Sequence, residues 1–316
     1  MRLFLGVDGG QSNTKALIGD EAGRVLGAGV GGPCNHAGAA EGREKLARAV
    51  QESVAAACGQ AKLDARQVRF EAACFGMSGG PEDKQAILAE ILPDAKLIVT
   101  HDALIALSGA TAGEPGVVVI AGTGSIAFGR NAAGEIARAG GWGFLFGDEG
   151  SGFDIVRQAL RAALRFEEGW GPKTALHRIL VEETGARDAN DLMHRLYTEE
   201  WPRPRASLLG RTVDVVALNG DPVAREILLN AAQQLATLAV SVRRRLFQPG
   251  ESASVCYIGG VFRSRILLER FRQLVELEEG SRAEPPRYEP AAGALLEAYR
   301  AVGLHRALSH IPESKT

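Results

Sequence analysis

The sequence predicts an α/β fold made of two related domains that enclose a cleft. An apolar run, a turn rich in glycine and small polar residues, and a second apolar run occur at residues 3–18 and again at 117–128. In both copies a turn and a third short strand follow, within the similar segments 19–29 (GDEAGRVLGAG) and 130–140 (RNAAGEIARAG). A weak internal repeat of this kind indicates a duplicated unit. A chain of 316 residues has room for two domains of ordinary size.

The first half is predicted to contain three strands followed by alternating helices and strands. Gly23 lies in the turn before the third strand, where glycine tolerates a positive φ. A segment with helical periodicity ends at Gly59. The expected elements are strands at 3–8, 13–19 and 24–30, a helix at 41–58, a strand at 69–75, a helix at 81–91, a strand at 96–100 and a helix from Asp102. This order is typical of a mixed α/β layer.

The second half repeats the three strands and then becomes largely helical. The expected elements are strands at 117–121, 124–130 and 135–139, helices across 153–247, a strand at 254–258, another helix, and a last helix from Ala291 that could pack on the first domain. We therefore expect domains at 1–115 and 116–299, with a C-terminal helix at 300–316 completing the first.

Composition excludes several classes of protein. The formal charge is −2 with charged residues interspersed, which argues against a partner such as nucleic acid. The run Arg243–Arg245 is interpreted as the solvated end of a helix. Four scattered cysteines contain no CxxC pair, so neither a zinc knuckle nor a redox dithiol is indicated. Without a signal peptide or a run of about 18 apolar residues, we expect a cytoplasmic protein without a membrane segment.

The first turn carries an acid at the end of a buried strand. A carboxylate at Asp8 is costly to bury unless it meets a cation or hydrogen-bond donors, and Mg²⁺ prefers such oxygen ligands. Gly9 and Gly10 let the backbone approach a phosphate. The alternative is a plain hairpin with an Asp-Gly turn. The Walker A pattern is absent.

The second turn, Gly122-Thr123-Gly124-Ser125, is the counterpart of the first. A single turn of this composition is common and needs no function. Two of them in duplicated positions predict a pair of phosphate-holding turns that face each other, which is a way to hold the phosphate tail of ATP from both sides.

A further acid follows the strand at 96–100. Asp102 is interpreted either as the N-cap of the next helix or as a general base at the carboxyl end of a strand, where α/β folds place their chemistry. The sequence leaves these two alternatives open.

Three other segments are candidates for ligand binding. The glycine-dense segment 140–152 carries three aromatic residues and two acids, which suits either a sugar or an ordered hinge. Asn35 and His36 follow the third strand, and an Asn side chain both donates to and accepts from hydroxyls. Gly259 and Gly260 end a strand in a turn against which a flat base could lie.

In this order, these segments resemble the sugar kinase/heat-shock 70/actin ATPase superfamily, and more narrowly the N-acetylglucosamine kinase-like branch of the BadF/BadG/BcrA/BcrD ATPases. The resemblance rests on GVDGGQSNTK, VVVIAGTGS, VCYIGGV and EPAAGALLEA, with CNH, THDA and GGWGFLFGDEGS marking the sugar branch. It implies two ribonuclease-H-like domains that close over ATP, Mg²⁺ and a hexosamine. A homodimer is also plausible from the family.

The resemblance also implies a role for each matching residue. Asp102 takes the proton of the attacking hydroxyl, on carbon 6 of the sugar, and Asp8 orients magnesium through water. The residues expected to bind the phosphates are Gly10, Ser12, Asn13, Thr14, Gly122, Thr123 and Gly124. Those expected to contact the adenosine are Gly259 and Gly260, and those expected to bind the sugar are Asn35, His36, Asp102, Thr123 and Asp148.

Two features leave alternatives open. Ile126 stands where animal N-acetylglucosamine kinases have an asparagine that reaches the sugar, so glucosamine and N-acetylmuramic acid stay open as substrates beside N-acetylglucosamine. The rival function is an activator ATPase for an acyl-CoA dehydratase or reductase. Such activators hold an iron–sulfur cluster through paired cysteines, and no two cysteines lie close together in this sequence.

Overall fold

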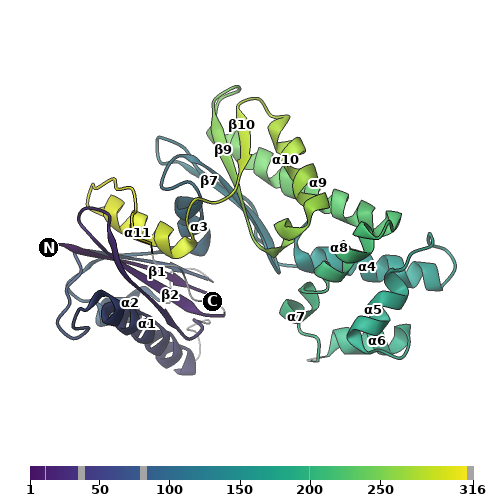
Figure 1. The fold of residues 1–316 in the computed structure, drawn as a ribbon, viewed down its shortest axis with the longest axis horizontal. Helices are drawn as coiled ribbons and strands as arrows, with labels where there is room; N and C mark the ends of the chain where they lie inside the picture. Colours follow the sequence, from purple (N-terminus) through teal and green to yellow (C-terminus); the bar gives the residue numbers. More distant parts are fainter. Residues whose placement is uncertain (11, 35–39, 79–83, 199, 312–316) are drawn as a thin grey trace. The chain divides into compact units, whose positions relative to one another are not determined.

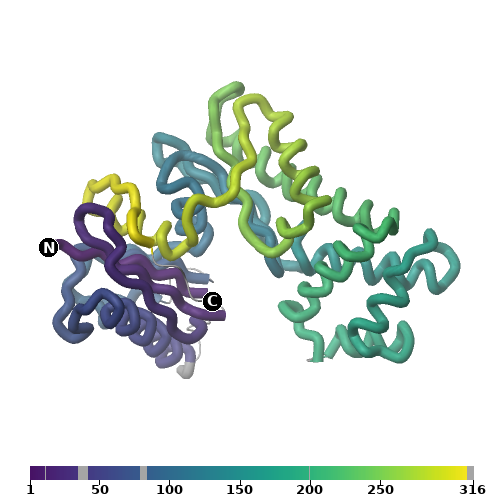
Figure 2. The backbone as a smooth tube through the Cα atoms, in the orientation of Figure 1, coloured from purple at the N-terminus to yellow at the C-terminus, as the bar shows by residue number. Residues whose placement is uncertain are grey.

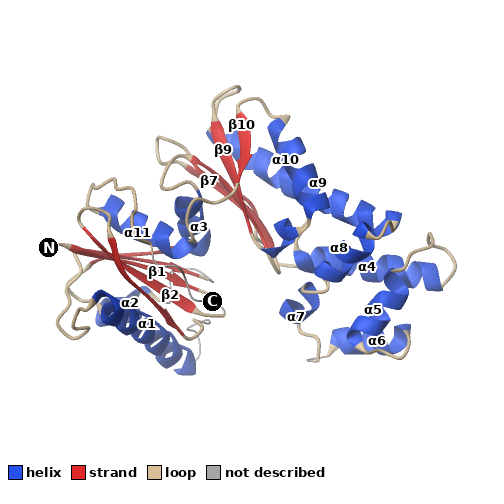
Figure 3. Cartoon of the chain, in the orientation of Figure 1, coloured by secondary structure: helices blue, strands red, loops and turns tan. Residues whose placement is uncertain are grey.

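The structure is a computed structural model that describes residues 1–10, 12–34, 40–78, 84–198 and 200–311. The chain forms two compact units (Figure 1). Unit 1 consists of Met1–Glu114 and Pro286–Thr316, and unit 2 of Pro115–Pro285. Each unit has a five-stranded mixed sheet with helices packed on it (Figure 3). The predicted α/β class with two ribonuclease-H-like sheets is confirmed.

The sheet of unit 1 has the strand order β3-β2-β1-β4-β5. Strand β1 is antiparallel to β2 and parallel to β4, and β4 is parallel to β5. The strands are β1 (Leu3–Gly9), β2 (Thr14–Asp20), β3 (Val25–Gly31), β4 (Ala72–Met77) and β5 (Lys96–His101). Helices α1 (Ala40–Ala61) and α2 (Gln85–Ile91) share one core with the sheet, while α3 (Asp102–Ala110) and α11 (Pro290–Ala301) share a second.

Unit 2 repeats this sheet and adds a helical region. Its strand order is β10-β9-β6-β7-β8, with β6 antiparallel to β7 and parallel to β9. The strands are β6 (Gly116–Ala121), β7 (Ser125–Arg130), β8 (Ile136–Gly140), β9 (Ala253–Ile258) and β10 (Ser281–Glu284). The helices are α4 (Gly152–Glu167), α5 (Leu176–Thr184), α6 (Ala189–Tyr197), α7 (Arg203–Ser207), α8 (Gly210–Leu218), α9 (Pro222–Leu246) and α10 (Arg265–Glu276), with a 3₁₀ turn η1 at Gly260–Arg263.

The end of the chain differs from the prediction. Residues 286–299 lie in unit 1 and not in the C-terminal domain, and the last helix ends at Ala301, so 302–311 do not continue it. Figure 2 shows this yellow segment beside the purple N-terminal strands. Leu295 and Tyr299 are fully buried in the second core, and Tyr299 Oη donates a hydrogen bond of 2.7 Å to the Asp20 carbonyl. The apolar side of α11 therefore completes unit 1.

The predicted solvated face at Arg243–Arg245 is wrong for its first member. Arg243 is 1% exposed and donates hydrogen bonds to the carbonyls of Gln248, Glu251 and Glu279 and to Ser281 Oγ. A buried guanidinium is stable where such acceptors replace water. Arg243 thus ties the end of α9 to the segment before β9 and to the start of β10.

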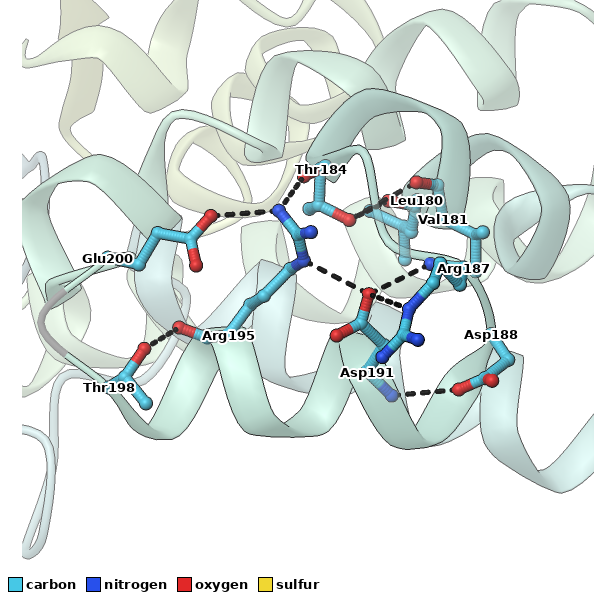
Figure 4. A network of polar contacts seen from close by, with 9 residues as sticks. All are labelled: Leu180, Val181, Thr184, Arg187, Asp188, Asp191, Arg195, Thr198 and Glu200. Atoms are coloured by element: carbon cyan, nitrogen blue, oxygen red, sulfur yellow. Dashed lines mark hydrogen bonds and ion pairs between the residues drawn. The ribbon is translucent and has the colours of Figure 1, made fainter.

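A polar network joins α5 to α6 in unit 2 (Figure 4). Asp191 Oδ2 accepts hydrogen bonds from the backbone N–H of Arg187 at 3.0 Å and from Arg195 Nε at 3.3 Å. Arg195 Nη1 also donates to the Thr184 carbonyl at 3.2 Å and to Glu200 Oε1 at 2.8 Å. Hydrogen bonds from the Arg187 backbone and guanidinium, and then from Arg195, lower the pKa of Asp191 to about 2.

We expect Asp191→Asn to destabilise unit 2 at neutral pH by an amount that depends on pH. The folded pKa lies below the ordinary value of 3.8, so the stabilisation by the ionised carboxylate is present above pH 3.8 and is lost as the pH falls toward 2. Urea unfolding of both proteins between pH 7 and pH 3 measures the difference, which should fall by about half at pH 3. Glu183→Gln, on the exposed side of α5, is the control. A difference that does not vary with pH would contradict this interpretation.

Among the described residues, no helix is long and apolar enough to cross a membrane.

Candidate functional site

In unit 1 the carboxyl ends of three parallel strands meet at one edge of the sheet. The register places Asp8 of β1 beside Gly76 of β4, and Gly76 beside Thr100 of β5. Because the strands run in the same direction, the residues that follow them come together. This brings Asp8, Ser78 and Asp102 to the same edge, where α/β proteins bind their ligands.

Asp102 is an exposed carboxylate with a defined orientation. It is the first residue of α3, and His101 occupies the N-cap position without a side-chain cap bond. Asp102 Oδ2 accepts a hydrogen bond of 2.9 Å from Ser78 Oγ, and Oδ1 accepts one of 2.8 Å from the Ala103 N–H. The predicted N-cap alternative is therefore not observed, and the carboxylate is held at the strand end by Ser78. An exposed, oriented carboxylate is suited to accept a proton.

Asp8 lies close to other charges. Burial and, next, the charge of Asp102 raise its pKa to about 6, while Lys15 opposes this shift. Lys15 Nζ itself forms an ion pair of 2.9 Å with Glu289 Oε2. Asp8 and Asp102 are neighbouring carboxylates, and the positive charge near them, Lys15, is itself paired with Glu289, so this position suits a bound cation. The described residues contain no group of three or more acidic, His or Cys side chains arranged for a metal, so a magnesium ion here would keep most of its waters.

The turn after β1 is closed by a hydrogen bond of 3.0 Å from the Gly10 N–H to the Asn13 carbonyl, and Ser12 and Asn13 are exposed. Thr14 differs from them because it is fully buried, and its hydroxyl donates to the Gly32 carbonyl at 2.8 Å. That hydroxyl holds the turn in place and is not presented at the surface. The predicted residues Asn35 and His36 lie outside the described residues.

The turn of unit 2 is joined to the acidic loop that follows β8. The Gly122 N–H donates to the Gly124 carbonyl at 2.9 Å, and Ser125 Oγ donates to the Glu149 carbonyl at 2.7 Å. Asp148 is 5% exposed, adopts a left-handed φ of 62°, and accepts a hydrogen bond of 3.2 Å from the Ser125 N–H. A side chain at Gly124 would place its Cβ 2.8 Å from Asp148 Oδ1. The close approach of turn and carboxylate therefore requires glycine at this position.

A cavity of about 360 Å³ opens beside this turn within unit 2. Gly122, Thr123 and Gly260 line one part of it. Asp214 and Ser264 also line it, and Asp214 accepts a hydrogen bond of 2.5 Å from Ser264 Oγ. Gly259 has a φ of 117° and stands where any side chain would meet the backbone of Ala121, so the strand end must be glycine. A cavity of this size suits a small organic ligand.

The glycine-dense loop exposes apolar side chains. Trp142, Phe144, Leu145 and Phe146 are all exposed, and Phe144 also packs edge-to-face on Phe153 with ring centroids 5.7 Å apart. Ile126, at the position noted in the sequence, would contact any side chain added at Gly141. The loop is thus ordered by packing on its inner side and presents aromatic surface on its outer side.

Comparison with known proteins assigns the chain to a family. The family model described as the BadF/BadG/BcrA/BcrD ATPase family matches residues 5–298. The chain belongs to this family. The resemblance stated from the motifs is thereby confirmed at family level.

Proteins similar to this chain are named as amino-sugar kinases. An N-acetylmuramic acid/N-acetylglucosamine kinase from Clostridium acetobutylicum is 33% identical over 88% of this chain and 91% of its own length. An N-acetyl-D-glucosamine kinase from Dictyostelium discoideum is 32% identical over 94% of this chain and 97% of its own. A crystal structure of a candidate N-acetylglucosamine kinase from Chromobacterium violaceum superposes with a TM-score of 0.73 at 26% identity, covering 94% of this chain and 98% of the other.

Sequence reasoning missed two residues that contact the predicted ones. Ser78 donates to Asp102, and Arg203 Nη1 lies 3.3 Å from Asp148 Oδ2. Ser78 carries a weak signal in the sequence, because it directly follows the buried strand β4 and the neighbouring strands β1 and β5 also have polar residues at their ends. The second carries none, because 55 residues separate Arg203 from Asp148 along the chain.

We expect Ser78→Ala to lower kcat about three- to tenfold, because the carboxylate of Asp102 loses the hydrogen bond that orients it. The KM for ATP should stay unchanged. Steady-state kinetics with ATP and an accepted sugar measure both constants. Ser78→Thr retains a hydroxyl and should restore most of kcat. A lower affinity for ATP with an unchanged kcat would contradict an orienting role.

Proposed function

We propose that this protein transfers the γ-phosphoryl group of ATP to the 6-hydroxyl of an amino sugar. The observation that carries the proposal is the exposed Asp102 carboxylate, held by Ser78 at the carboxyl end of the unit 1 sheet. Family membership and the names of the relatives support the same reaction class.

Asp102 acts as the general base in this proposal. One carboxylate oxygen accepts the proton of the sugar hydroxyl as the new O–P bond forms and the bond to ADP breaks. The Ser78 hydroxyl holds Oδ2 and the Ala103 N–H holds Oδ1, so the carboxylate has a fixed orientation, and a second lone pair on its exposed side accepts the proton. Positioning and electrostatic stabilisation are the main contributions that a protein makes to phosphoryl transfer, and a base of this kind orients the hydroxyl and accepts its proton.

Asp8 is the residue that would hold Mg²⁺. Magnesium, when bound, neutralises phosphate charge. The carboxylate is destabilised by burial and by Asp102, which is the environment that a cation relieves. The nearby ammonium of Lys15 is already paired with Glu289, which leaves room for a second positive charge.

Each unit contributes backbone N–H groups for phosphates. In unit 1 these are the groups of the turn around Gly10, Ser12, Asn13 and Thr14, where the Gly10 N–H closes the turn on the Asn13 carbonyl and the Thr14 side chain has a structural role. In unit 2 they are the groups of the turn at 122–124, which the Asp148 loop holds in place. The adjoining 360 Å³ cavity, with Gly260 on its wall, is the proposed adenosine site, and Gly259 directly precedes Gly260 in the chain.

The substrates in view are N-acetylglucosamine, glucosamine and N-acetylmuramic acid. Asp148 and Thr123 lie at the same turn and are proposed to bind sugar hydroxyls together with Asn35, His36 and Asp102. The exposed Trp142 and Phe146 offer an apolar surface for a sugar ring. The relative from Clostridium acetobutylicum is named for two of these sugars, which supports keeping both.

The arrangement of the cysteines disfavours the activator alternative. Cys34, Cys58, Cys74 and Cys256 are all buried. Cys58 lies in the first core of unit 1 and Cys74 in the second. Burial raises the pKa of both thiols, whereas iron–sulfur ligation requires thiolates.

The test is ADP release from ATP and Mg²⁺ with a panel of sugars. The panel contains glucosamine, N-acetylglucosamine, N-acetylmuramic acid, glucose and N-acetylmannosamine, with a control that lacks sugar. Strong stimulation by an amino sugar is expected. ATP hydrolysis that is indifferent to every sugar would overturn the proposal and direct attention to iron content.

A further inference from the structure

Arg203 lies beside the carboxylate proposed to bind the sugar, but its own charge has no role in the proposed reaction. Its Nη1 is 3.3 Å from Asp148 Oδ2, and its guanidinium lies over the Phe144 ring at 5.0 Å from the centroid. The Arg203 side chain is 36% exposed, whereas that of Asp148 is 7% exposed. The guanidinium therefore forms the solvent-facing layer above a buried acid.

The geometry leaves most of the donors of this guanidinium available. A guanidinium carries five N–H groups in a planar fork. Within the part of the chain that the structure describes, Asp148 is its single carboxylate partner, through one long contact. The Phe144 ring contacts one side of the guanidinium, and the side chain of Arg203 stays 36% exposed, so solvent reaches part of the fork. An edge with free parallel donors matches the two oxygens of a carboxylate.

The contact with Asp148 places this open edge next to the sugar site. A hydroxyl that hydrogen-bonds to Asp148 lies within a few ångströms of the guanidinium, because Asp148 touches both. A neutral sugar leaves the open donors to water. A sugar with an acidic substituent replaces that water with a charge-assisted pair.

We propose that Arg203 is a specificity-determining residue that binds the carboxylate of an acidic amino sugar, of which N-acetylmuramic acid is the test case. This inference rests on the proposed function. According to this inference, N-acetylmuramic acid forms an ion pair with Arg203 that N-acetylglucosamine, which has no carboxylate, cannot form.

Arg205 provides a matched control on the same helix. It stacks on Trp201 at 4.1 Å and donates to the Glu200 carbonyl at 2.7 Å. It therefore has the same charge and a similar aromatic contact, but its partners do not include Asp148.

The experiment compares kcat/KM for N-acetylmuramic acid and N-acetylglucosamine in the wild type, Arg203→Met, Arg203→Lys and Arg205→Met. Arg203→Met should lower kcat/KM for N-acetylmuramic acid about 10- to 100-fold more than for N-acetylglucosamine, mainly through KM. Arg203→Lys should lose part of this preference, since an ammonium keeps the charge but not the fork. Arg205→Met should leave the ratio unchanged.

Several outcomes overturn the inference while the proposed function stands. One is a wild type that phosphorylates N-acetylglucosamine but not N-acetylmuramic acid. Another is an equal loss for both sugars in Arg203→Met, which would reduce Arg203 to support of Asp148. If that variant is unstable in thermal melts, an unchanged substrate ratio in Arg203→Lys counts against the inference. Failure of the wild type with every sugar overturns the proposed function instead.

Discussion

Replacing Asp102 with asparagine is expected to lower kcat by about 10²- to 10⁴-fold. The amide keeps the size of the side chain and can still accept the hydrogen bond from Ser78, but it cannot take the proton of a sugar hydroxyl. Binding of ATP and of the sugar should change little. Initial rates of ADP formation measure the loss, and calorimetric titration of nucleotide and sugar checks that the site is intact.

Asp94→Asn is a suitable control for this substitution. Asp94 is exposed in the same unit and pairs with Arg69 at 2.9 Å, just before the amino ends of β4 and β5, whereas Asp102 follows the carboxyl end of β5. Its variant should retain the activity of the wild type. Near-normal turnover of Asp102→Asn would remove Asp102 from the role of base, and a large loss of sugar affinity would assign it to binding.

The largest expected effect on stability comes from Arg243→Met. Methionine fills part of the volume of the buried side chain but removes the guanidinium donor from the part-buried carbonyls of Glu251 and Glu279, while the Gln248 carbonyl keeps the Glu251 N–H. Each buried acceptor left unpaired costs about 1–3 kcal/mol. We expect the free energy of unfolding to fall by about 3–5 kcal/mol, measured by urea unfolding at neutral pH.

Arg244→Met separates this effect from a simple loss of charge. Arg244 is the next residue, is 67% exposed, and pairs with Glu278 at the surface at 2.7 Å. Its replacement should cost less than about 1 kcal/mol. Similar losses for Arg243→Met and Arg244→Met would show that the buried network contributes no more than a surface pair.

The strands and the acids at their ends could be predicted because their signals are local. Asp8 and Asp102 each follow a short apolar run, and the register of β1, β4 and β5 then places both at one edge of the sheet. The turn at 122–125 was recognisable for the same reason. The family resemblance added roles to these residues that periodicity alone does not supply.

The rest depended on contacts between distant segments. Strand β10 has only four residues, Ser281–Glu284, and two of them are charged, so no apolar pattern marks it. Arg243 sits in a polar run, and its burial follows from carbonyls that later segments bring to it. Arg203 becomes relevant only because the fold carries α7 to Asp148. Helix α11 belongs to unit 1 because it packs on the strands of that unit, which is again a contact between distant segments of the chain.

The return of the chain to unit 1 has a consequence for the order of folding during synthesis. Unit 2 is one continuous stretch, 115–285, whereas unit 1 needs α11 to cover the second face of its sheet. The ribosome therefore synthesises all of unit 2 before Phe4 of β1 and Cys74 of β4 can be buried against Leu295 of α11. Until then that face is an apolar surface open to chaperones and to other nascent chains. Unit 1, whose synthesis begins first, is therefore the second of the two units to complete its fold.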